Sequence, residues 1–69
     1  MTQKELAYVE DAIGHEGNII KIIDESIKNL QDERLISFMQ AELNTHTAMK
    51  EKLMNLLEAK ANEWSVNYG

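Results

Sequence analysis

The sequence predicts an all-α protein in which two antiparallel helices form a hairpin and two hairpins form a four-helix bundle. Proline is absent, and glycine occurs only at positions 14, 17 and 69, so the frequent turns of a sheet are missing. Apolar residues recur at steps of three and four over residues 6–30, which is the spacing of one helix face. One short polar break at residues 29–32 is the only interruption. The chain is therefore expected to form one helical-hairpin domain spanning residues 1–69.

The first helix is expected over about residues 3–30. Thr2 and Glu5 have the spacing of a capping box, in which each side chain satisfies a free backbone N–H of the other residue. The apolar positions that follow form a heptad seam. They are Leu6, Val9, Ile13, Ile20, Ile23, Ile27 and Leu30. Glu16 occupies the remaining seam position, and Gly14 and Gly17 flank it, which indicates a close helix approach or a local kink there.

The second helix is expected over about residues 33–64. Asp32 is a suitable N-cap, and Glu33 in the first turn interacts favourably with the helix dipole. At 100° per residue, one narrow apolar stripe follows. It contains Leu35, Met39, Leu53, Leu57 and Trp64, with His46 at its centre and Glu42 at its edge. Residues 65–69 have no periodicity and are expected to form a short tail.

The short length favours a homodimer. A chain of 69 residues buries too little surface to be robust alone and usually needs a disulfide, a metal or a partner subunit. Cysteine is absent, which excludes disulfides and thiolate zinc sites. Ile19, Ile22 and Ala12 lie beside the first seam and would form a second contact surface. A dimer of hairpins covers that surface economically.

The charge and the apolar runs exclude several classes of partner. The net charge of −5, without a basic stripe, disfavours nucleic acid. The apolar runs are far shorter than the roughly 20 residues that span a bilayer, and the mixed polar faces do not favour a membrane surface. The first five residues lack the basic and apolar regions of a secretory signal, so we expect a cytoplasmic or spore-coat protein.

Glu16, Glu42 and His46 are the candidate metal ligands. Glu16 precedes the middle of the break by 15 residues and His46 follows it by 15, so equal rise per residue brings them to one level. Glu42 lies one turn nearer the break. A dimer would then combine four carboxylates and two imidazoles, the kind of ligand set found in di-iron and di-manganese bundles, and suited to Fe, Mn or Zn. The usual motif in such bundles is Glu-x-x-His, and the spacing from Glu42 to His46 is one residue longer than that. Alternatively, the three side chains form a polar layer that sets helix register.

The chain also resembles a known family. The similar segments are residues 4–12 leading into His15-Glu16, the polar break over residues 31–35, the region around His46, and Trp64. Together they resemble the Coat F family of ferritin-like, spore-coat-associated proteins of spore-forming Firmicutes, over roughly residues 3–64. The resemblance implies a ferritin-like helix pair, with Glu16 and His46 at the family's Glu and His positions, and a role in the spore or cell interior of a spore former.

Three functions are consistent with these patterns. The first is a small non-catalytic structural or assembly protein, associated with the spore coat and contacting other coat or helical proteins. The second is a ferritin-like metal-binding protein, which would support oxygen or peroxide chemistry only with a complete iron site. The third is an intracellular helical adaptor or regulator. No catalytic triad, phosphate loop or dinucleotide fingerprint is present, so no enzyme is expected.

Overall fold

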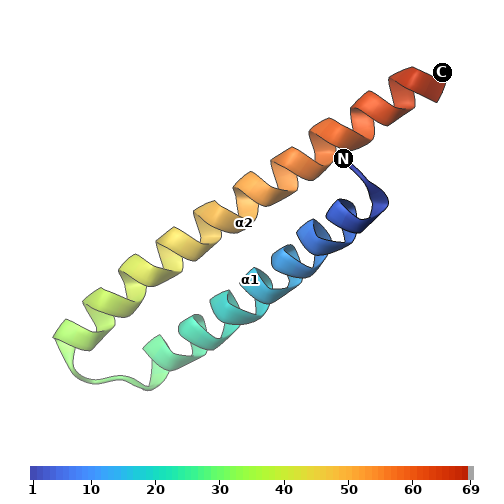
Figure 1. The fold of residues 1–69 in the computed structure, drawn as a ribbon. Helices are drawn as coiled ribbons and strands as arrows, with labels where there is room; N and C mark the ends of the chain where they lie inside the picture. Colours follow the sequence, from blue (N-terminus) through green and yellow to red (C-terminus); the bar gives the residue numbers. More distant parts are fainter. Residues whose placement is uncertain (69) are drawn as a thin grey trace.

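The protein folds as an all-α hairpin, which confirms the helical hairpin expected from the sequence. The computed structural model describes the backbone of residues 1–68 and the side chains of residues 1–61. Helix α1 spans Gln3–Asn29 and helix α2 spans Glu33–Tyr68. The two helices run antiparallel and pack side by side along the length of α1 (Figure 1).

The predicted capping box starts α1. The Glu5 backbone N–H donates to the Thr2 hydroxyl at 3.0 Å, and the Thr2 backbone N–H donates to the Glu5 carboxylate at 2.8 Å. The hydrogen bond from the Thr2 backbone lowers the pKa of Glu5, because it stabilises the ionised carboxylate. The cap is therefore fully formed above the ordinary glutamate range and weakens as the pH falls through the lowered pKa.

The connection between the helices is as short as the sequence indicates. Leu30 caps the end of α1, and its N–H donates to the Ile27 carbonyl at 3.3 Å. The Asp32 carboxylate accepts from the backbone N–H groups of Arg34 at 2.8 Å and Leu35 at 3.3 Å. Asp32 thus acts as the N-cap predicted for the second helix.

Helix α2 extends to Tyr68 and does not end near Trp64, so residues 65–68 belong to the helix and not to a tail. Neither proline nor glycine occurs in residues 65–68 to stop the helix, and the first such residue is Gly69. The side chain of Trp64, which the sequence places in the apolar stripe, lies outside the described part of the chain.

The contact seam of α1 is the predicted one, whereas that of α2 differs from the predicted stripe. The half-buried side chains of α2 recur at alternating steps of three and four. They are Ile36, Met39, Leu43, His46, Lys50, Leu53, Leu57 and Lys60, with Glu42 beside them. Leu35, predicted to lie in the stripe, is exposed instead. A strict heptad seam drifts by about 20° per repeat relative to a straight helix. The stripe drawn at a constant 100° per residue therefore included Leu35 at the start of α2, where the seam contains Ile36.

The hairpin is elongated and has little interior. Ile23, with 7% of its surface exposed, is the only side chain that counts as buried among those described. The radius of gyration is 16.0 Å, whereas a compact domain of this length would have about 11 Å. The Cα trace extends 54 Å along its longest axis and 13 Å along its shortest. A single hairpin therefore covers only part of its apolar surface.

The two internal glycines do not mark a close approach of the helix backbones. A Cβ atom on Gly14 would meet nothing within 4 Å, and one on Gly17 would lie at an ordinary contact distance of 3.5 Å from the Lys50 ammonium. Within one hairpin, a close approach of the neighbouring helix therefore does not explain Gly14. Over the described residues, no helix is both long enough and apolar enough to cross a membrane.

Candidate functional site

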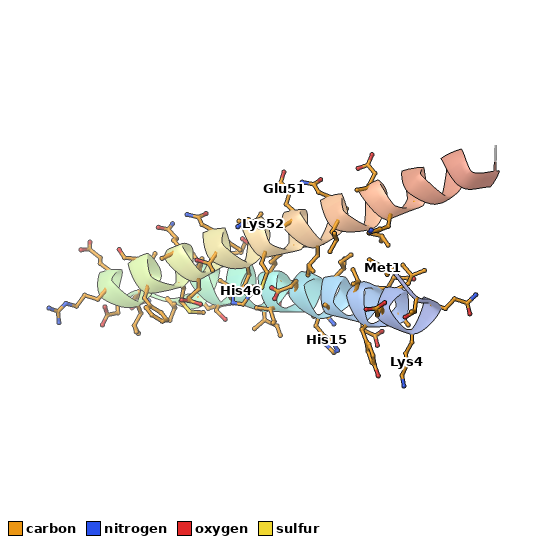
Figure 2. All side chains as sticks on the ribbon, turned by 45° about the horizontal axis from the view of Figure 1, so that its top comes forward. Met1, Lys4, His15, His46, Glu51 and Lys52 are labelled. Carbon is orange, nitrogen blue, oxygen red and sulfur yellow. The ribbon has the colours of Figure 1, made fainter. Side chains whose placement is uncertain are left out.

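Glu16, Glu42 and His46 come together midway along the hairpin, and we call this group the polar layer. Nδ1 of His46 lies 2.5 Å from the Glu16 carboxylate, which confirms the predicted meeting of α1 and α2 at this level. Nε2 of His46 lies 3.6 Å from the Glu42 carboxylate, one turn earlier on the same helix. The imidazole of His46 lies between the two helices, whereas His15 points away from α2 (Figure 2).

The two carboxylates of the polar layer have different surroundings. The Glu16 side chain is 12% exposed, because it replaces an aliphatic residue in the seam. The Glu42 side chain is 41% exposed at the edge of the seam. An ionised carboxylate can only accept hydrogen bonds, so a hydrogen bond between His46 and an ionised Glu16 requires a proton on Nδ1 of the ring. When Nε2 is also protonated, the imidazolium faces a carboxylate at each nitrogen.

The geometry of the polar layer limits how one chain could hold a metal ion. Glu16 and Glu42 face different nitrogens of the same ring, so the three side chains do not point at one common position. Across the described residues, no group of three or more His, Cys, Asp or Glu side chains is arranged to hold a metal ion. With Glu16 orienting the ring, His46 and Glu42 would give an ion two ligands, fewer than a tetrahedral site needs. Metal binding remains a prediction that requires ligands from a second copy.

Lys50 is the polar-layer neighbour that the sequence interpretation missed. It is half-buried, one seam position after His46, and its ammonium lies over Gly17 next to Glu16 in the chain. Continuing the steps of three and four from Ile36 would have placed Lys50 in the seam. A lysine is usually assigned to the solvent, although its long apolar stem can pack along a helix while the ammonium reaches water.

A second feature of the hairpin is an apolar surface beside the seam, which we call the apolar face. We call the first residue of each heptad pair in the seam a leading seam position. These positions are Leu6, Ile13, Ile20 and Ile27 on α1, and Ile36, Leu43, Lys50 and Leu57 on α2. The members of the apolar face lie one residue before, or two residues after, a leading seam position. Equivalent positions of two antiparallel helices lie on the same side of the pair, so these side chains share one face. They are Tyr8, Ala12, Ile19 and Ile22 on α1, and Leu35, Phe38, Met49 and Leu56 on α2.

Most of the apolar face is exposed in the single hairpin, although its composition is that of an interior; Ala12 and Ile19 are half-buried. Ile22 is 62% exposed and Phe38 is 61% exposed. On the opposite side, the equivalent positions are mostly polar or small. They are Glu10, Gly17, Asp24, Gln40, Thr47 and Met54. Large contiguous apolar patches mark interaction surfaces in water-soluble proteins. The asymmetry between the two sides therefore indicates one contact surface, on the side of Phe38 and Ile22.

Comparison with known proteins identifies no relative of this chain: no protein-family model, curated protein or solved structure matches it. The resemblance to the Coat F family accordingly stays a prediction that rests on the sequence segments alone.

Proposed function

We propose that this chain is a small, non-catalytic structural protein that assembles by pairing the apolar faces of two hairpins into a four-helix bundle. The observation that carries the proposal is a contrast among the described side chains: Ile23 alone is buried, whereas a row of large apolar side chains is exposed on one side and Met54 alone on the other. The polar layer sets the register of the hairpin in this view. The resemblance to Coat F proteins would place such an assembly in a spore coat.

The exposed area supports a second copy as the occupant of the apolar face. A compact protein of 7.9 kDa would expose about 4,400 Å². The hairpin exposes 5538 Å², which is roughly 1,100 Å² more than that compact reference. A standard dimer interface buries about 800 Å² on each partner. The excess is therefore of the size that one self-complementary contact removes.

Folding should depend on protein concentration if the dimer supplies most of the interior. We expect the Tm to fall by about 3–5 °C for each tenfold dilution, because dissociation becomes linked to unfolding. Circular dichroism melts from micromolar to millimolar protein, with sedimentation equilibrium on the same samples, measure both effects. A monomer that unfolds cooperatively at one Tm throughout this range would contradict the proposal.

A metal-binding role is the alternative that the polar layer favours, since Glu16 already orients the His46 ring. Under our proposal Glu16, Glu42 and His46 set the register and hold no metal, so Fe²⁺, Mn²⁺ or Zn²⁺ at millimolar concentration should leave the Tm within about 1 °C of its metal-free value. Melts of the wild type and of His46→Ala, with elemental analysis after desalting, provide the check. Retained metal and a raised Tm, both lost in His46→Ala, would support the ferritin-like alternative instead.

The adaptor alternative differs from self-assembly in the partner that covers the apolar face. An adaptor would stay monomeric by itself and would bind the helices of another protein. Sedimentation equilibrium of the purified chain therefore also separates these two possibilities.

A further inference from the structure

The charged residues along α2 favour one orientation for the second copy. Within the two rows of α2 that form or border the apolar face, the described charged residues are Glu42 and Lys52. One row lies one residue before the leading seam positions of α2 and consists of Leu35, Glu42, Met49 and Leu56. The other row lies two residues after them and consists of Phe38, Thr45, Lys52 and Ala59. Covering this surface would remove water from the Glu42 carboxylate, which is costly unless a cation replaces the water.

The arrangement with both interhelical loops at the same end does not provide that cation. It places α2 against α1 of the partner, and the α1 residues of the apolar face that lie level with Glu42 are Ile19 and Ile22. His15 is the basic residue nearest to them on that side of α1, and it lies more than one helical turn away. Glu42 would then be covered by apolar and neutral side chains.

The arrangement with the loops at opposite ends does provide a cation. It places α2 antiparallel to α2 of the partner, and a two-fold axis level with Thr47 brings Glu42 to the partner's Lys52 and Lys52 to the partner's Glu42. The same axis sets Phe38 opposite the partner's Leu56 and Met49 opposite the partner's Thr45. One register therefore pairs the opposite charges and also pairs the large apolar side chains of Phe38 and Leu56.

We propose that two copies of this chain associate through antiparallel α2 helices, with the interhelical loops at opposite ends and two Glu42–Lys52 ion pairs across the two-fold axis. This inference rests on the proposed self-assembly and adds its orientation. Each partner's Lys52 then completes the polar layer of the other subunit by neutralising the Glu42 carboxylate that faces His46. Lys52 is exposed in the single hairpin, so a second copy can reach it.

A charge exchange between subunits tests this orientation. Lys52→Glu alone and Glu42→Lys alone each create two like-charge pairs, and each should raise the dimer Kd by about 10- to 100-fold. Mixing the two variants restores both opposite-charge pairs, so we expect a heterodimer with a Kd close to that of the wild type. Glu51→Lys, at an exposed position off the apolar face, is the matched control and should leave the Kd unchanged. Circular dichroism verifies that each variant remains helical.

A distance measurement provides a second, independent test. The chain has no cysteine, so Gln31→Cys in the exposed loop accepts a single spin label. Loops at opposite ends predict a separation between labels of about 50 Å, whereas loops at one end predict less than about 25 Å. A wild-type dimer with a short separation, or one indifferent to the charge exchange, would overturn this orientation and leave self-assembly intact. A wild-type chain that is monomeric throughout would overturn the proposed function itself.

Discussion

Phe38→Glu should dissociate the dimer, with a Kd at least 100-fold above that of the wild type. Phe38 is 61% exposed in the single hairpin, so the substitution removes little packing within one chain. At the dimer contact the same position would be covered, and a carboxylate without a partner would lose its water. Sedimentation equilibrium measures the Kd, and the expected change corresponds to a loss of about 2.7 kcal/mol of association free energy.

Met54→Glu is the matched control for this substitution. Met54 is also an exposed apolar side chain, at 49%, but it lies on the side of α2 opposite Phe38. We expect its Kd to stay within about threefold of the wild-type value, a difference below 1 kcal/mol. If both variants dissociated equally, the contact surface would not be confined to the apolar face. If neither did, Phe38 would lie outside the contact.

The polar layer should respond in opposite directions to the loss of one partner and to the loss of both. His46→Leu leaves the Glu16 carboxylate in the seam without its 2.5 Å partner, and we expect a loss of about 1–3 kcal/mol in the free energy of unfolding. In Glu16→Leu/His46→Leu the seam becomes continuously apolar. The double variant should be as stable as the wild type or more stable by about 1–2 kcal/mol, since the exchanged groups are not fully buried.

Urea unfolding at a fixed protein concentration measures these differences, and Lys28→Leu provides the control. Lys28 forms an exposed ion pair with Asp24 at 3.3 Å, so its loss should change stability by less than about 0.5 kcal/mol. A double Leu variant less stable than His46→Leu alone would show that the polar layer does more than set register. If the double variant kept its stability but no longer formed a single kind of dimer, the polar layer would have a role in selecting one helix arrangement.

The seam of α1 and the contact between its middle and α2 could be predicted from residue spacing. The spacing of Leu6 to Leu30 is a property of one helix, and it holds whatever the helix packs against. The short break before Asp32 then determines that the helices run antiparallel. Equal distances along the chain from that break bring Glu16 and His46 to one level.

The sequence by itself thus determined two helices, their caps, their antiparallel order and the meeting of Glu16 with His46. Only the tertiary structure decided which α2 residues enter the seam, because Leu35 and Ile36 are adjacent apolar candidates. The choice between them depends on the supercoil that both helices share, and a single helix does not encode it. The same packing leaves Phe38 exposed and Lys50 half-buried. It also directs Glu16 and Glu42 to different nitrogens of His46.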